Sequence, residues 1–330
     1  MLRTMRPFFI ALVCTWITTI ATAIFYYQHT IHSQWVMTAA LPAFLIEAIF
    51  YLGSVFTETR EWLGRLGPAR LQAAILWVSG VIPYCVFALA SGTFQRNAFY
   101  LLAALSAIFA FWYALLPRRA AYDVGFLVIA AAPIVARVFP RIYVSPDPHL
   151  RIDILGHLMW IRLGIAALLI LRGWDPGAFG FWPRAREWRM GLFWYAVFLI
   201  PIVLVALATH DVRFAPLQGP WWRVGGIGMG TFFGVLWVVA LGEELFFRGV
   251  IERGLLDRWR SPALAIVISA LVFGAAHLWF HHYPDWRSAV TASVLGAGCG
   301  VAYWQSGSVR TPMVTHAFVV TTWRLLFKYF

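Results

Sequence analysis

Two glutamates and an arginine lie close together within a long apolar stretch of this sequence, in the segment GEELFFRG that begins at Gly242. Charged residues inside membrane segments are costly and usually mark a functional site. Glu244 and Arg248 are four residues apart, so on a helix they share a face in the order that favours an ion pair. Glu243 points about 100° away on a helix of roughly 3.6 residues per turn, and four residues later the chain carries the apolar Phe247. The spacing predicts that Glu244 and Arg248 neutralise each other and that Glu243 is free for chemistry.

Two histidines in later apolar stretches could complete this chemistry. Phe273 and His277 are one helical turn apart in VFGAAHLWF and share a face. Glu243 and His277 are each 17 residues from residue 260, in the polar turn between their two stretches, which predicts equal depth in an antiparallel helix pair. His316, in the last apolar stretch, is expected at a similar level. These spacings predict that Glu243, His277 and His316 converge.

A carboxylate and imidazoles in a shallow intramembrane cavity can deprotonate a water and then protonate a leaving amine. A second histidine can stabilise the oxyanion that develops, so a peptide bond is a suitable substrate. Ser269, two turns before His277, carries no sign of activation as a nucleophile. The alternative for Glu243 is a buried acid that is neutral or hydrogen-bonded to a neighbouring helix.

The composition places these residues in a membrane protein. Hydrophobic residues make up 61% of the 330 residues, charged residues 12%, and the mean hydropathy is +0.73, whereas soluble domains are about one-quarter charged. The net charge of +12 comes from basic residues in short loops between apolar runs, which encode membrane topology rather than nucleic-acid binding. Cys14, Cys85 and Cys299 lie in apolar segments without metal or disulfide spacing and are interpreted as packing residues.

The apolar runs predict an all-α, polytopic integral membrane helix bundle with about 11 spans. Their approximate ranges are 8–27, 35–56, 71–90, 98–116, 124–139, 154–171, 192–208, 224–256, 262–280, 288–304 and 312–327.

The arginines of alternate loops predict a cytoplasmic N-terminus in a multi-pass protein, located in the inner membrane if the cell is bacterial. Residues 1–171 are interpreted as transmembrane spans of unknown role. Residues 172–190 are rich in Trp and Arg and are predicted to form a polar cytoplasmic loop. Residues 191–330 then form a membrane core that carries the candidate chemistry.

The order of these motifs resembles a known family, the type II CAAX prenyl endopeptidases and their bacterial CPBP relatives, which are glutamic intramembrane proteases. The similarity covers about residues 192–327. The EExxxR, FxxxH and final-histidine motifs of the family fall, in turn, on Glu243, Glu244 and Arg248, on Phe273 and His277, and on His316.

The resemblance implies that Glu243 and His277 activate the water and that His316 helps to bind the oxyanion. It gives Glu244, Arg248 and Phe273 supporting roles. The implied partner is a membrane-anchored peptide or protein in the lipid bilayer, bearing either a prenylated C-terminus or a C-terminal sorting signal, and no cofactor is implied.

One position departs from the family pattern. The family usually has Asn or Asp four residues after the last histidine, and this chain has Val320. An oxyanion donor is therefore missing, a loss that can cost on the order of a hundredfold in rate. Thr321 and Thr322 are nearby hydroxyls, although neither shares that helical face as well.

Three other functions remain open at this point. A zinc-dependent membrane protease would use Glu243, His277 and His316 as ligands, although HExxH is absent. A non-catalytic immunity or scaffold protein would keep the ion pair and lose parts of the site. A transporter would explain the number of spans, with Glu47 and Arg162 as further intramembrane charges, but the two halves of the sequence show no symmetry.

Overall fold

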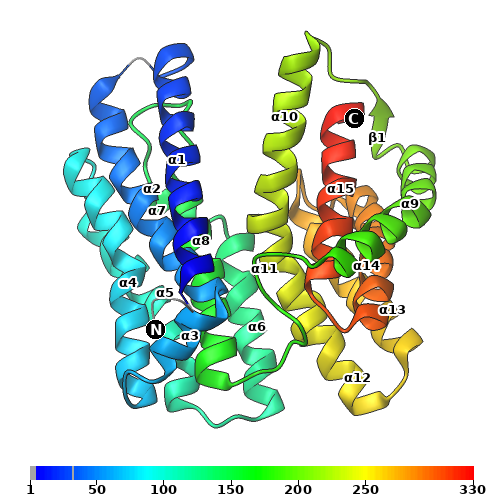
Figure 1. The fold of residues 1–330 in the computed structure, drawn as a ribbon, viewed down its shortest axis with the longest axis horizontal. Helices are drawn as coiled ribbons and strands as arrows, with labels where there is room; N and C mark the ends of the chain where they lie inside the picture. The colour runs from blue at the N-terminus through cyan, green and yellow to red at the C-terminus, as the bar shows by residue number, and fades with distance from the viewer. Residues whose placement is uncertain (1–4, 32) are drawn as a thin grey trace. The chain divides into compact units, whose positions relative to one another are not determined.

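The computed structural model describes residues 5–31 and 33–330. The described chain is helical apart from two three-residue strands, as predicted for an all-α membrane protein. It divides into two compact units, Met1–Trp174 and Asp175–Phe330 (Figure 1).

The described part of the first unit is built from helices. They are α1 (Arg6–His29), α2 (Gln34–Val55), α3 (Thr57–Gly64), α4 (Ala69–Ala90), α5 (Arg96–Leu115), α6 (Ala120–Val135), α7 (Phe139–Ile142) and α8 (Ile154–Ala166), which continues as the π-helical η1 (Ala167–Arg172).

The two intramembrane charges of the first unit pair with each other. Nε of Arg162 lies 2.6 Å from Oε1 of Glu47, and both side chains are almost completely buried. The guanidinium also donates to the hydroxyl and the carbonyl oxygen of Ser79, each at 2.8 Å. Because both charges are compensated inside the helix bundle, this pair joins α2, α4 and α8.

The second unit is built around one long helix, which Figure 1 shows running continuously from α10 to α12. Its elements are α9 (Ala185–Ala208), β1 (Val212–Phe214), α10 (Trp221–Gly234), η2 (Val235–Val239), α11 (Ala240–Glu244), η3 (Leu245–Glu252), α12 (Arg253–Trp259), α13 (Pro262–Ala276), η4 (His277–Trp279), α14 (Trp286–Ser306), α15 (Arg310–Leu326) and β2 (Phe327–Tyr329).

Each of the 11 predicted apolar stretches corresponds to helical structure. Among the described residues, eight helices are long and apolar enough to cross a membrane. The other three stretches are α6 with 16 residues, α14 with 21 residues and α15 with 17 residues, which are shorter or less apolar. The chain is therefore a multi-pass membrane protein, and its predicted orientation stays a prediction.

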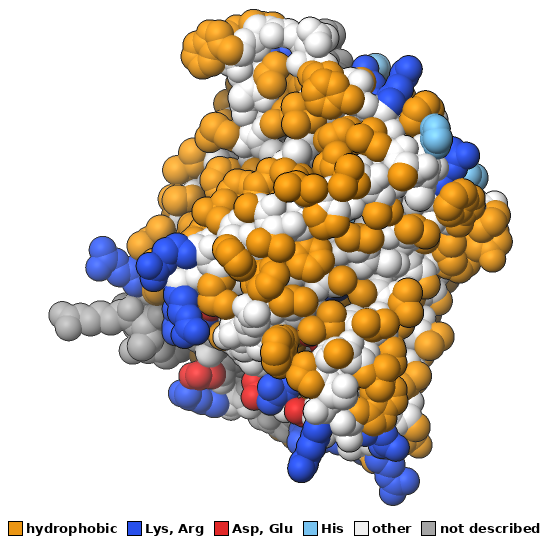
Figure 2. All heavy atoms as spheres, turned by 90° about the vertical axis from the view of Figure 1, so that its right-hand side faces the viewer, with side chains coloured by type: hydrophobic (Ala, Val, Ile, Leu, Met, Phe, Trp, Pro, Cys, Tyr) orange, Lys and Arg blue, Asp and Glu red, His pale blue; other side chains and the backbone are white. Residues whose placement is uncertain are grey.

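The surface of the second unit also indicates a lipid environment. Large apolar side chains of α9 and α13 are exposed, among them Phe193, Ile200, Leu204, Val267 and Leu271. Figure 2 shows hydrophobic side chains over most of one face, with Lys and Arg side chains at its bottom, its left edge and its upper right. An apolar surface with basic residues beyond it is typical of a membrane-embedded bundle.

The segment predicted as a polar loop, 172–190, is helical from Ala185 onward. The reason is a buried ion pair that the apolar pattern does not reveal. Oε1 of Glu187 accepts hydrogen bonds from Nη2 of Arg310 at 2.8 Å and from the Ser308 hydroxyl at 2.6 Å. Glu187 also accepts from the backbone N–H of Arg184, which caps the helix. The start of α9 is thereby fixed to the start of α15.

The two strands bring distant segments of the second unit together. β1 pairs with β2 in antiparallel register, with Val212 opposite Tyr329. The backbone N–H of Phe330 donates to the carbonyl oxygen of Asp211. The turn after α9 is therefore held beside the end of α15.

Candidate active site

Glu243 and Glu244 end a short α-helical segment that lies between two π-helical turns. α11 is preceded by η2 and followed by η3, which contains Arg248. π-Helical turns inside helices are frequent at functional sites, because they place side chains in positions that a regular α-helix does not offer. The long helix therefore changes its winding at the position of the predicted charges.

Glu244 and Arg248 form the predicted ion pair. Nε of Arg248 lies 3.1 Å from Oε2 of Glu244, and both side chains are 0% exposed. The guanidinium also donates to the carbonyl oxygen of Gly296 at 3.2 Å. Its carbon lies 4.7 Å from the centre of the Phe273 ring, a cation–π distance. Phe273 thus packs against the buried cation, and the pair joins η3 to α13 and α14.

Glu244 has a second partner, which the sequence does not reveal. Its Oε1 lies 2.7 Å from Nδ1 of His316 on α15. A carboxylate only accepts hydrogen bonds, so Nδ1 carries the proton and donates it. The Nε2 atom of His316 is then directed away from Glu244, and a fixed tautomer of this kind prepares an imidazole for catalysis. Arg248, Glu244 and His316 form one buried polar chain.

Glu243 lies at the free end of this chain. Its Oε2 is 3.9 Å from Nε2 of His316, and its side chain is 35% exposed. Oε2 itself is buried and has no hydrogen-bond partner among the described residues. A polar separation above 3.5 Å between two acceptors is one that a water can bridge. Among the described residues, the only ion-pair contact of Glu243 is with this imidazole.

His277 is the first residue of η4, where the helix tightens after α13. Its Nδ1 lies 2.9 Å from the carbonyl oxygen of Phe273, to which it donates. The ring packs at 4.7 Å between centres against the Phe273 ring, and the ring of Phe273 also meets the edge of His316. Phe273 therefore stands between the two histidines. Among the described residues, no hydrogen bond or ion pair joins His277 to Glu243.

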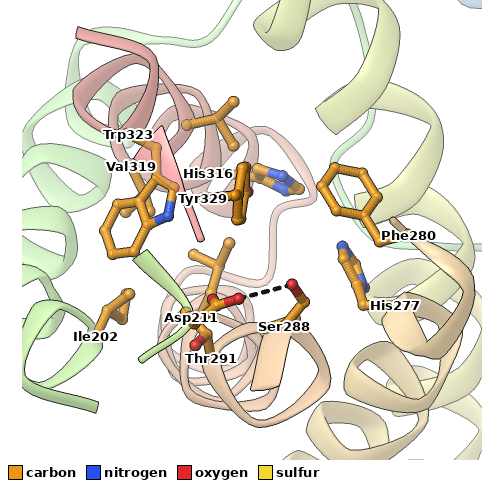
Figure 3. Close-up of a pocket in the computed structure, with 13 residues that line it drawn as sticks. Ile202, Asp211, His277, Phe280, Ser288, Thr291, His316, Val319, Trp323 and Tyr329 are labelled. Carbon is orange, nitrogen blue, oxygen red and sulfur yellow. Dashed lines mark hydrogen bonds between the residues drawn. The ribbon is translucent and has the colours of Figure 1, made fainter. Parts of the chain in front are cut away.

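Both histidines line a cavity of about 120 Å³. Figure 3 shows His277, Phe280 and His316 on one side and Ile202, Val319 and Trp323 on the other. Asp211, Ser288 and Thr291 also line it, and Ser288 donates to Asp211 at 2.8 Å (Figure 3). The cavity thus extends from the imidazoles to a polar wall built by the turn after α9 and the start of α14.

Val320, the residue that departs from the family pattern, lines the same cavity. The two nearby hydroxyls donate elsewhere. Thr321 donates to the carbonyl oxygen of Ala317 at 2.7 Å, and Thr322 donates to that of Phe318 at 2.9 Å. Neither threonine replaces the missing donor in this arrangement.

The metal ligands weighed from the sequence were Glu243, His277 and His316. The described residues instead gather Glu244, Cys299 and His316, whose ligand atoms lie within 4.8 Å of one another. Glu244 is already paired with Arg248 through Oε2 and with Nδ1 of His316 through Oε1, and a metal held by Nδ1 and Oε1 would have to displace the second of these contacts. This donor set therefore does not fit a resident metal ion.

The residues of the polar wall could not be found from the sequence. Asp211 is a single acid in the turn between two spans, and Ser288 and Thr291 are ordinary hydroxyl residues at the start of a span. No spacing rule relates them to the histidines, because only the packing of α9, α14 and α15 brings them together.

The fold and the site define a helical integral membrane protein with a buried carboxylate and imidazole site. Residues 225–322 match the family model described as Rce1-like, type II CAAX prenyl endopeptidase. All six predicted site residues lie inside this segment, and the match confirms the family resemblance for it. The family consists of membrane peptidases. No curated protein and no solved structure was found to match the chain.

Proposed function

We propose that the second unit is an intramembrane endopeptidase of the glutamic type, which hydrolyses a peptide bond of a membrane-anchored substrate with a water activated by Glu243. The observation that carries this proposal is the 3.9 Å separation between Oε2 of Glu243 and Nε2 of His316. Both atoms can accept a hydrogen bond from one water, and the Glu243 side chain is 35% exposed although Oε2 itself is buried.

The polar chain behind His316 supports this assignment. Glu244 fixes the proton on Nδ1 and stabilises an imidazolium when Nε2 takes up a proton. Arg248 supplies the counter-charge of the buried Glu244 carboxylate. Glu243 would remove a proton from the water as the water oxygen attacks the carbonyl carbon. This proton would pass from Glu243 to Nε2 of His316, and His316 would deliver it to the leaving amine as the C–N bond breaks.

His277 is assigned to the other side of the scissile carbonyl. Its Nδ1 donates to Phe273, so its Nε2 is free to face the cavity that it shares with His316. When protonated, this nitrogen can donate to the developing oxyanion. The family resemblance pairs Glu243 with His277 instead, and we favour His316 as the partner of Glu243 because of the contact between them.

The proposal is tested with a pool of membrane-anchored peptides, some prenylated and some with a C-terminal sorting signal, incubated with the protein purified in detergent. Cleavage by the unaltered protein should disappear in Glu243→Gln and persist with a strong chelator. Equal cleavage by both proteins would overturn the assignment of Glu243. Loss of cleavage with the chelator would favour the metal-dependent alternative, and no cleavage by either would favour the non-catalytic one.

A further inference from the structure

The cavity next to the two histidines carries an uncompensated negative charge at its polar wall. Asp211 is 6% exposed, and one oxygen, Oδ1, accepts from the Ser288 hydroxyl at 2.8 Å. Among the described residues, no Lys, Arg or His forms an ion pair with Asp211. A buried carboxylate without a counter-charge is unfavourable. A cation that entered the cavity would supply the missing charge.

Two hydroxyls beside Asp211 can also accept hydrogen bonds from such a cation. The Ser288 hydroxyl donates its hydrogen bond to Asp211, and the Thr291 hydroxyl donates to the carbonyl oxygen of Arg287 at 3.1 Å. Each hydroxyl oxygen keeps lone pairs for an incoming donor. Together with Oδ2 of Asp211, the wall offers three acceptors, which is the number of N–H donors on an ammonium group.

The remainder of the cavity is apolar and small. Ile202, Leu295, Val319 and Trp323 line it, and these side chains fit an aliphatic stem. Its volume is about 120 Å³, and a cavity of about 150 Å³ holds one benzene molecule. One side chain of about the size of lysine therefore fits, whereas a prenyl chain is several times too large.

We propose that this cavity binds the side chain of a lysine adjacent to the scissile bond of the peptide substrate. The proposal rests on the proposed peptidase function and names the specificity of its site. The stem of the lysine lies against Val319 and Trp323, and its ammonium group meets Asp211. Arginine is a poorer occupant, because a guanidinium pairs best with both oxygens of a carboxylate and one of them is engaged by Ser288.

The test uses membrane-anchored fluorescent peptides that carry either lysine or norleucine at each position of the segment beside the anchor; norleucine keeps the four side-chain carbons of lysine and lacks the ammonium group. Binding to Glu243→Gln in detergent is measured by fluorescence anisotropy, and cleavage by the unaltered protein is measured in parallel. Asp211→Asn, alone and combined with Glu243→Gln, removes the charge with little change of shape. Asp257→Asn is the matched control, since Asp257 is exposed on α12 and lies outside the cavity.

At one position, lysine should bind about tenfold or more tightly than norleucine, as expected for a charge-assisted hydrogen bond. Asp211→Asn should remove this preference, and Asp257→Asn should keep it. Equal binding of lysine and norleucine peptides at all positions would overturn the proposal, and this comparison needs only a change in the peptide. A lysine preference in binding without any cleavage would keep the cavity proposal and overturn the peptidase. Cleavage that depends on Glu243 but not on lysine would keep the peptidase proposal and overturn the cavity proposal.

Discussion

Nδ1 of His316 donates to Oε1 of Glu244 at 2.7 Å, while Nε2 of the same ring lies 3.9 Å from Oε2 of Glu243. One imidazole thus meets both members of an adjacent glutamate pair. Neighbouring residues of a helix do not face each other, so only a group from another helix can contact both. The structure gives the two carboxylates different environments: Glu244 is fully buried and paired, whereas Glu243 is partly exposed.

Glu244→Gln is therefore expected to affect both stability and activity. It leaves Arg248 buried without its counter-charge, which typically costs about 3 to 5 kcal/mol. It also removes the carboxylate that holds the proton of His316 on Nδ1. The temperature of thermal unfolding in detergent and the rate of peptide cleavage should both fall sharply. Glu243→Gln is the matched comparison, and its free energy of unfolding should change by about 0.5 kcal/mol or less. Equal destabilisation by the two substitutions would contradict this division of roles.

Val320→Asn is expected to increase the rate of the proposed peptidase. Val320 lines the cavity beside the histidines, and an amide there supplies a donor for the oxyanion. Losing such a donor costs about a hundredfold or more, so adding one should raise kcat by about tenfold, with KM changed less. Val320→Ala enlarges the cavity without a donor and is the control. A similar increase in Val320→Ala would show that space, and not the hydrogen bond, limits the rate.

The ion pair between Glu187 and Arg310 should stabilise the second unit. Both side chains are about nine-tenths buried, so Glu187→Gln leaves a buried arginine that lacks its counter-charge and should cost about 3 kcal/mol or more. The double variant Glu187→Gln with Arg310→Met should be more stable than Glu187→Gln alone. Unfolding of the unaltered protein, Glu187→Gln, Arg310→Met and the double variant in one detergent measures the coupling, and strictly additive effects would show that the pair contributes nothing.

Acid should remove the contribution that ionised Asp285, at the start of α14, makes to the free energy of unfolding. Burial opposes ionisation of Asp285, yet the hydrogen bonds of His281 and of the Ser288 backbone N–H hold its pKa below the ordinary value. A lowered pKa in the folded state stabilises the protein above the unfolded pKa of about 3.9 and loses this effect as the pH falls. The difference in free energy of unfolding between the unaltered protein and Asp285→Asn should therefore be constant near neutrality and shrink below about pH 4. A difference that grows on acidification would contradict the sign.

Local spacing predicted the local part of the site. The ion pair between Glu244 and Arg248 follows from a separation of four residues, and the spans follow from apolar runs. The contact between His316 and Glu244 joins positions 72 residues apart, and only packing decides it. The equal-depth argument predicted convergence of Glu243 and His277, but depth says nothing of the direction in which a side chain points, and the contact of Glu243 is with His316.

The π-helical turns explain a further difference between expectation and structure. The run 224–256 is expected as one apolar span, and the pairing of Glu244 with Arg248 assumes the period of a regular α-helix, whereas η2 and η3 interrupt that period on both sides of the glutamates. In the first unit, Glu47 and Arg162 were separate candidates because 115 residues divide them. Their pairing could not be predicted from the sequence, because no local spacing rule connects α2 with α8.

The polar chain of Arg248, Glu244 and His316 also has a consequence for how related sequences should diverge. Since each member leaves the others unpaired when it changes alone, these three positions should be inherited or replaced together. Glu243 has no such bond and can be lost without unfolding the protein. A relative that had kept the fold as an inactive scaffold should therefore show its first substitution at Glu243, with the three bonded positions unchanged.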